Sequence, residues 1–128
     1  MKEKIGIITD STCDIPRELL NKLAIQVLPL RILYKGKEYR DGVDITPETV
    51  YAHLEEEVPT TSLPSPQDVE ALLLQMKEHG YTHVLVIHLS SGLSGTGQMI
   101  EPVAPGIDGL VVKTIDSKSI SMGLGFIV

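Results

Sequence analysis

The sequence has a single cysteine, Cys13, among its 128 residues. One cysteine excludes a disulfide within the chain and any zinc site built from several cysteines. It also fits a reducing cytosol, so we expect a cytoplasmic protein. We expect Cys13 to be a small buried apolar residue, because a nucleophilic role would need an activating base beside the thiol.

Basic residues and long apolar runs are also scarce. Eleven Lys and Arg stand against seventeen Asp and Glu, which gives a net charge of −6. This balance disfavours nucleic acid and anionic lipid as partners, because both need a basic surface. No apolar run approaches the roughly 20 residues of a membrane span. Residues 1–5 lead directly into a strand-like pattern, so we expect no secretory leader.

Apolar residues make up 42% of the chain and charged residues 22%, close to the average of globular proteins. A chain of this length can bury a real core as one domain. We therefore expect residues 1–128 to fold as a single domain.

Short apolar, β-rich runs occur at 5–10, 84–89 and 110–115, and each is apolar on both faces. Such runs are typical of buried parallel strands. A fourth run, 26–33, contains Pro29, which cannot donate a ladder hydrogen bond and indicates an edge strand or a bulge. A turn at 35–38 then precedes a short returning segment at Tyr39.

Helix signals fall between these runs. Three helices are expected to begin at a capping residue followed by a proline in the first turn. The pairs are Asp14 with Pro16, Thr46 with Pro47, and Ser65 with Pro66. The third helix has apolar residues at helical spacing and Gly80 as its C-terminal stop. Alternating strands and helices predict a three-layer α/β domain with a mostly parallel sheet of at least four strands.

Two segments depart from this pattern. Pro102 and Pro105 shorten the helix expected after the third strand. Residues 119–128 resemble the start of an apolar helix without a polar cap, so we expect another chain or a further segment to cover it.

Four polar clusters lie at strand ends or in the connections, where ligands gather in parallel sheets. They are Asp10-Ser11-Thr12, Thr60-Thr61-Ser62, the segment from Ser90 to Gly97, and Asp116-Ser117. Hydroxyls, backbone N–H groups and a glycine-rich turn suit an anionic head group such as a carboxylate or phosphate. Each hydroxyl could equally be a local cap or turn residue.

The glycine-rich segment fails the spacing of familiar enzyme motifs. Gln98-Met99 stands where a P-loop requires Lys and Ser or Thr. Ile100 replaces the third glycine of a dinucleotide-binding turn, and Thr96 replaces the last glycine of a nucleophile elbow. No histidine pair has metal-binding spacing, and His88 is the histidine expected closest to the candidate pocket.

Five stretches resemble the DegV family, in order along the chain. They are Ile8–Pro16, Tyr39–Thr46, Pro59–Pro66 with Leu63 in place of the usual Gln, Leu89–Thr96, and Asp116-Ser117 with the glycines that follow. The resemblance covers essentially the whole chain and implies the first of the family's two α/β domains, with the second domain absent from this sequence.

The resemblance implies a non-catalytic protein that holds a long-chain fatty acid and presents its carboxylate to a separate fatty acid kinase. That kinase would make acyl phosphate for phospholipid synthesis. Carried over by motif, the carboxylate-binding residues are Thr61, Ser62, Ser91, Gly92, Ser94 and Gly95. The supporting loop residues are Asp10, Ser11, Thr12, Asp116 and Ser117. No cofactor and no metal are implied.

Two other functions remain open from the sequence. One is a shortened structural domain that forms a homodimer through its apolar C-terminus and binds no ligand. The other is a phosphate-ester enzyme that uses Asp10 and Ser94.

Overall fold

The computed structural model describes residues 3–92, 95 and 109–128. Its main sheet has four strands in the order β2-β1-β6-β7, with every neighbouring pair parallel. The strands are β1 (Ile5–Asp10), β2 (Ile25–Leu28), β6 (His83–His88) and β7 (Val111–Asp116). The predicted parallel sheet is therefore confirmed.

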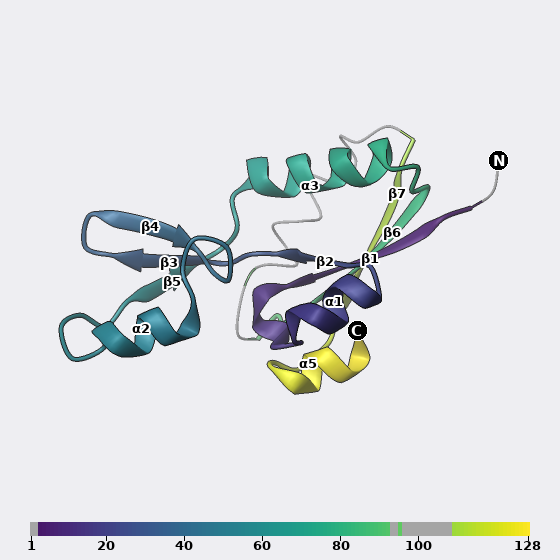
Figure 1. The fold of residues 1–128 in the computed structure, drawn as a ribbon. Helices are drawn as coiled ribbons and strands as arrows, with labels where there is room; N and C mark the ends of the chain where they lie inside the picture. The colour runs from purple at the N-terminus through teal and green to yellow at the C-terminus, as the bar shows by residue number, and fades with distance from the viewer. Residues whose placement is uncertain (1–2, 93–94, 96–108) are drawn as a thin grey trace.

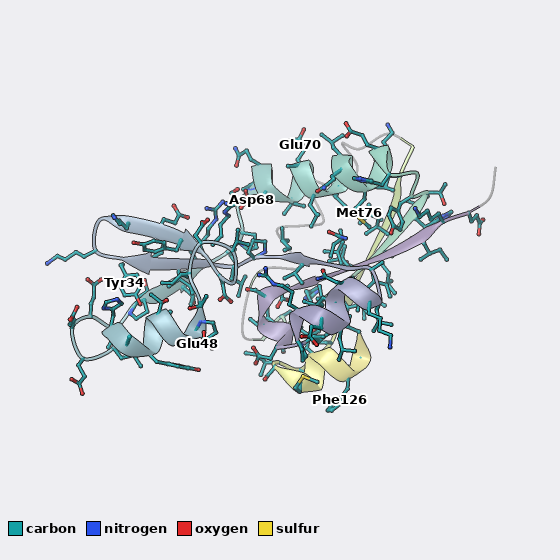
Figure 2. All side chains as sticks on the ribbon, in the orientation of Figure 1. Tyr34, Glu48, Asp68, Glu70, Met76 and Phe126 are labelled. Atoms are coloured by element: carbon teal, nitrogen blue, oxygen red, sulfur yellow. The ribbon has the colours of Figure 1, made fainter. Side chains whose placement is uncertain are left out.

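Helices cover both faces of this sheet (Figure 1). Helix α3 (Pro66–Glu78) lies on one face, and α1 (Arg17–Lys22) and α5 (Met122–Ile127) lie on the other. Met76 points from α3 toward the sheet, whereas Glu70 points away (Figure 2). The core on the α3 side is formed by Ile8, Leu28, Val69, Leu73, Met76, Val84, Val86 and Leu110. This is the three-layer arrangement that the sequence predicts.

The ends of α3 follow its sequence signals. The Ser65 hydroxyl accepts a hydrogen bond from the N–H of Asp68 at 3.1 Å, and Pro66 occupies the first turn. Just beyond the helix, Gly80 has φ +86°, a left-handed conformation that glycine adopts without a steric penalty. Both predicted ends of this helix are confirmed.

A second, antiparallel sheet has the order β4-β3-β5 and lies beside the parallel one (Figure 1). Its strands are β3 (Arg31–Tyr34), β4 (Lys37–Arg40) and β5 (Thr60–Ser62). The prediction of one strand over 26–33 is wrong, because β2 ends at Leu28 and β3 begins at Arg31. Pro29 has no N–H to continue the ladder, and the chain leaves the first sheet there.

The start of α1 also differs from the prediction. Asp14 does not cap this helix, since α1 begins at Arg17 after Pro16 and has no side-chain cap. Residues Ser11–Cys13 instead form a short 3-10 turn that ends at Asp14, whose φ is +54°. The Asp14 carboxylate accepts a hydrogen bond from the Ser121 hydroxyl at 2.5 Å and so connects this turn to the start of α5.

The apolar C-terminal segment forms α5 and is half covered. Leu124 is fully buried against Cys13, Ile87 and Leu89. A Cβ on Gly125 would lie 2.8 Å from the Cys13 carbonyl oxygen, so glycine permits this close approach. Phe126 is 84% exposed and points away from the sheet (Figure 2). Pro102 and Pro105 lie outside the described residues.

Helix α2 (Pro47–His53) lies between β4 and β5 in the chain and buries none of its residues. Its predicted cap is confirmed, because the Thr46 hydroxyl accepts a hydrogen bond from the N–H of Thr49 at 3.3 Å. Within the described part of the chain, no helix is long and apolar enough to cross a membrane.

Candidate functional site

The carboxyl ends of β1, β6 and β7 lie side by side and bring three of the four polar clusters together. In the register of these strands, Thr9 lies opposite Ile87 and His88 lies opposite Asp116. The residues that follow each strand therefore meet at one edge of the sheet. This edge is where ligands gather in parallel sheets.

Asp10 holds two of these clusters together. It is 1% exposed, and its carboxylate accepts hydrogen bonds from the N–H of Leu89 at 2.7 Å and the N–H of Thr12 at 2.9 Å. The Thr12 hydroxyl donates to the same carboxylate. A buried carboxylate whose oxygens accept these bonds serves to fix the loops.

Asp116 fixes the start of the serine-rich loop. Its carboxylate accepts hydrogen bonds from the N–H of Ser91 at 3.2 Å, the Ser91 hydroxyl at 2.5 Å and the N–H of Lys118 at 2.9 Å. The Ser91 hydroxyl, and after it the Lys118 N–H, holds the pKa of Asp116 below its usual range. Because a hydroxyl has one proton, Ser91 can offer a ligand only its lone pairs while this bond persists.

Backbone hydrogen bonds reinforce the same edge. The N–H of Ser90 donates to the carbonyl of Ser119 at 2.8 Å, and the N–H of Ser117 donates to the carbonyl of His88 at 3.1 Å. The N–H of Gly92 donates to the Ser90 hydroxyl oxygen at 3.2 Å. Gly92 is exposed and Gly95 is half-buried, whereas Ser94 lies outside the described residues.

The sequence prediction did not select Ser90, Lys118 or Ser119 as site residues, although all three shape this edge. Lys118 contributes through its backbone N–H, which donates to Asp116, and no sequence pattern predicts this hydrogen bond. Ser90 and Ser119 are joined through backbone groups that meet only when β6 and β7 are paired.

Thr61 and Ser62 lie in β5 of the second sheet, and both are exposed. Ser62 is the end of β5 nearer the parallel sheet. It lies opposite Arg31, which follows Leu30, and the N–H of Leu30 donates to the Ser11 hydroxyl oxygen at 3.0 Å. Successive residues of a strand point to opposite faces, so these two side chains cannot both contact one head group from the same side.

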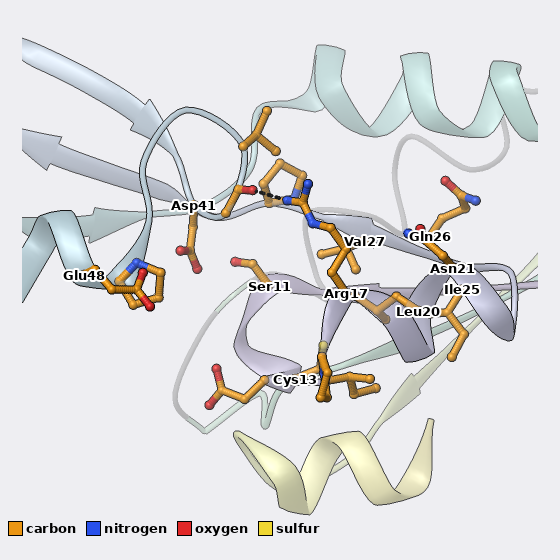
Figure 3. Close-up of a pocket in the computed structure, with 17 residues that line it drawn as sticks. Ser11, Cys13, Arg17, Leu20, Asn21, Ile25, Gln26, Val27, Asp41 and Glu48 are labelled. Atoms are coloured by element: carbon orange, nitrogen blue, oxygen red, sulfur yellow. Dashed lines mark hydrogen bonds between the residues drawn. The ribbon is translucent and has the colours of Figure 1, made fainter.

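A cleft of about 760 Å³ lies beside α1, near the connection between β4 and α2 (Figure 3). Ser11 and Asp41 face each other across it, and Asp14 and Glu48 also line it. Burial raises the pKa of Asp41. Arg17 is also a lining residue, and it donates to the carbonyl of Gly42 at 2.7 Å. A cleft with three carboxylates and one guanidinium is unfavourable for an anionic ligand.

Cys13 and His88 are both buried. Cys13 is 3% exposed, as predicted, and burial raises the pKa of its thiol. His88 is 5% exposed, and its Nδ1 lies 2.8 Å from the carbonyl oxygen of Leu89. Over residues 3–92, 95 and 109–128, no three His, Cys, Asp or Glu residues are placed to hold a metal ion.

Comparisons with known proteins identify the family. Residues 4–128 match the family described as "Uncharacterised protein, DegV family". A DegV domain-containing protein of Clostridium acetobutylicum is 48% identical over 126 residues, which are 98% of this chain and 45% of that protein. The chain thus spans about half the length of the curated relatives it matches.

Two solved structures are similar in fold and sequence. One is a DegV family protein from Thermus thermophilus, described by its fatty acid binding, with 38% identity and a TM-score of 0.84 over 95% of this chain and 44% of that one. The other is DegV from Bacillus subtilis, described as a fatty acid binding protein, with 31% identity and a TM-score of 0.91 over 98% of this chain and 45% of that one. With the family match over residues 4–128, these likenesses show that the chain belongs to the DegV family.

Proposed function

We propose that this protein binds a long-chain fatty acid, with its carboxylate at the carboxyl edge of the parallel sheet. The observation that carries the proposal is the meeting of the Asp10, Ser91 and Asp116 clusters at that edge. The two similar structures described as fatty-acid-binding support the choice of ligand. The proposed site residues are Thr61, Ser62, Ser91, Gly92, Ser94 and Gly95.

These residues contribute in different ways. Ser91 donates to Asp116, so its role is to shape the loop while neighbouring hydroxyls and N–H groups face the carboxylate. Ser62 lies nearer the sheet edge than the rest of β5 and contributes a hydroxyl from the face that it shares with Arg31. The Thr61 side chain lies on the opposite face of β5. Both hydroxyls can therefore bind the head group only if it lies at the edge of β5, where it can be reached from both faces.

The acyl chain supplies most of the affinity in this proposal. Each buried CH₂ contributes about 0.8 kcal/mol, whereas a hydrogen bond to a charged group contributes about 1.5–3 kcal/mol. The cleft beside α1 is a poor place for the head group, because Asp14, Asp41 and Glu48 line it.

The protein is proposed as a binding subunit rather than an enzyme. A separate fatty acid kinase would phosphorylate the presented carboxylate, and the product would enter phospholipid synthesis. The geometry does not favour a phosphate-ester enzyme that uses Asp10, since its buried carboxylate accepts hydrogen bonds from Leu89 and Thr12. A homodimer through α5 is the second candidate, favoured by the exposure of Phe126.

Native mass spectrometry of the purified chain, before and after organic extraction, tests the proposed ligand. The expected result is an extractable adduct with the mass of a long-chain fatty acid. A Thr61→Ala/Ser62→Ala double variant is expected to weaken the Kd for added fatty acid about 10- to 100-fold, the loss of one charged hydrogen bond.

Thr60→Ala is the matched control, because Thr60 is an exposed hydroxyl at the far end of the same strand. Its affinity is expected to equal that of the parent chain. Unchanged binding by the double variant would place the head group elsewhere, and absence of any fatty acid binding by the parent chain would refute the proposed function.

A further inference from the structure

An ion pair connects the second sheet to the helix that covers the parallel sheet. The guanidinium of Arg31, at the start of β3, donates to the carboxylate of Asp68 in the first turn of α3. We propose that Arg31 is a positioning residue of the fatty acid site, which together with Asp68 fixes the place of the Ser62 hydroxyl so that it faces the carboxylate of the ligand. This inference rests on the proposed function.

The Ser62 hydroxyl is a donor with its proton available. Among the described residues its side chain has no hydrogen-bond partner, whereas the Ser91 hydroxyl already donates to Asp116. Ser62 ends β5, an edge strand of three exposed residues that pairs with β3. The place of this hydroxyl therefore depends on the place of β3.

Arg31 is the residue of β3 directly opposite Ser62. Directly opposite residues of an antiparallel pair lie on the same face and are close neighbours. None of the residues of β3, β4 and β5 is buried, so packing within this sheet does little to fix its position. Its contacts with the rest of the molecule do so instead, and the contact between Arg31 and Asp68 lies beside Ser62.

Asp68 is itself firmly placed. The Ser65 hydroxyl accepts a hydrogen bond from its N–H at 3.1 Å, and the next residue, Val69, is buried in the core of the parallel sheet. Pro64, in the connection from β5 to α3, is also fully buried. The Asp68 carboxylate therefore has a fixed position, and Arg31 joins β3 to it.

The charges around Arg31 favour a positioning role over direct contact with the ligand. Glu38 Oε1 lies 3.7 Å from Arg31 Nε, so two carboxylates flank one guanidinium and leave no net positive charge for an anionic head group. The Arg31 side chain is only 19% exposed. Because the pair is largely shielded from water, removing one partner leaves an uncompensated charge and disturbs its surroundings more than the loss of a surface pair would.

The test measures the Kd of Arg31→Gln and Arg31→Lys for a C16 fatty acid and for the C16 fatty alcohol. Arg31→Gln is expected to weaken the Kd for the acid about tenfold and the Kd for the alcohol less than threefold, because hydrogen bonds to a charged acceptor are roughly twice as strong as those between neutral groups. Arg31→Lys keeps a positive charge for Asp68, so it is expected to restore most of the affinity for the acid.

A double-mutant cycle with Ser62→Ala gives a readout that a merely structural role would not move. Because Arg31 acts through Ser62, Arg31→Gln is expected to change the Kd for the acid less than threefold when Ser62 is already alanine. Arg40→Gln is the matched control, since Arg40 lies opposite Arg31 in β4 but pairs with Asp44 instead of α3. It is expected to leave both Kd values unchanged.

Each other outcome overturns a distinct statement. Equal losses for acid and alcohol, with a lower Tm, would show that Arg31 only stabilises the fold. A full tenfold loss in the Ser62→Ala background would show that Arg31 does not act through Ser62. Unchanged binding of the acid by Arg31→Gln would overturn the positioning role alone, whereas a parent chain that binds neither compound would overturn the proposed function as well.

Discussion

Asp41 and Asp44 lie three residues apart between β4 and α2, yet their surroundings act on them in opposite directions. Burial raises the pKa of Asp41, although the Ser11 hydroxyl partly offsets this. The side chain of Arg40 holds the pKa of Asp44 below its usual range. Arg40 donates to Asp44 from its backbone N–H and from two guanidinium nitrogens at 3.0–3.1 Å.

These opposite shifts predict opposite effects of the same substitution. A raised folded pKa means that Asp41 costs stability once it is ionised, and this cost disappears as pH falls below the unfolded value of about 3.9. Asp41→Asn is therefore expected to raise the Tm at pH 7 and to match the parent chain near pH 3. A depressed folded pKa means that Asp44 contributes stability above about pH 4, so Asp44→Asn is expected to lower the Tm at pH 7.

Thermal unfolding from pH 3 to pH 8 measures both variants. Their difference from the parent chain is expected to shrink toward low pH, where the carboxyl groups are protonated in both the folded and unfolded states. Equal shifts of the same sign at pH 7 would contradict the assignment of burial to Asp41 and of an ion pair to Asp44.

At the scale of elements, α3 is the helix whose sequence and structure agree most fully. Ser65, Pro66 and Gly80 mark its ends, and its buried residues Val69, Leu73 and Met76 pack in the core against the parallel sheet. Leu73 is 1% exposed in the core, whereas the adjacent Leu74 is 41% exposed. Two leucines in one helix thus differ almost completely in burial.

This pair predicts a large difference between two identical truncations. Leu73→Ala is expected to lower the free energy of unfolding by about 2–5 kcal/mol, because it removes buried methyl groups and leaves a cavity. Leu74→Ala is expected to change it by less than about 0.5 kcal/mol. Urea denaturation followed by circular dichroism measures both, and similar losses would show that α3 does not pack as described.

The boundaries of β2 and β3 show where sequence patterning fails. Residues 26–33 form one apolar run around Pro29, and apolar character alone does not reveal that the two halves join different sheets. The division depends on partners far along the chain, because β2 pairs with β1 while β3 pairs with β4 and β5. The same limit explains Asp14, whose carboxylate contacts Ser121 instead of capping α1.

At the scale of the whole molecule, α5 buries one side and exposes the other. Leu124 packs under the 3-10 turn, while Phe126 is 84% and Ile127 51% exposed. Exposed aromatic and aliphatic groups at one end of a domain are typical of contact surfaces.

The second candidate function, a homodimer, predicts that the chain dimerises through this side of α5. Sedimentation velocity over a range of concentrations is expected to show a dimer for the parent chain and a monomer for Phe126→Ser. Tyr51→Ser is the matched control, because Tyr51 is 69% exposed on α2, far from α5 in Figure 1. A parent chain that is monomeric at every concentration, or a Phe126→Ser variant that still dimerises, would contradict this surface.

The sequence by itself determined the alternation of strands and helices, the caps of α2 and α3, the burial of Cys13 and the residue types of the polar clusters. The alternation and the caps depend on near neighbours in the chain, so local patterning carries them, whereas the burial of Cys13 was indicated by residue type and is produced by Ile87, Leu89 and Leu124. Only the tertiary structure decided which clusters meet. Parallel pairing brings Asp10, Ser91 and Asp116 to one edge, whereas Thr61 and Ser62 enter a second sheet and point to opposite faces. Long-range contacts also decide whether the proton of a hydroxyl is free to bind a ligand. The Ser91 hydroxyl, for example, already donates its proton to Asp116.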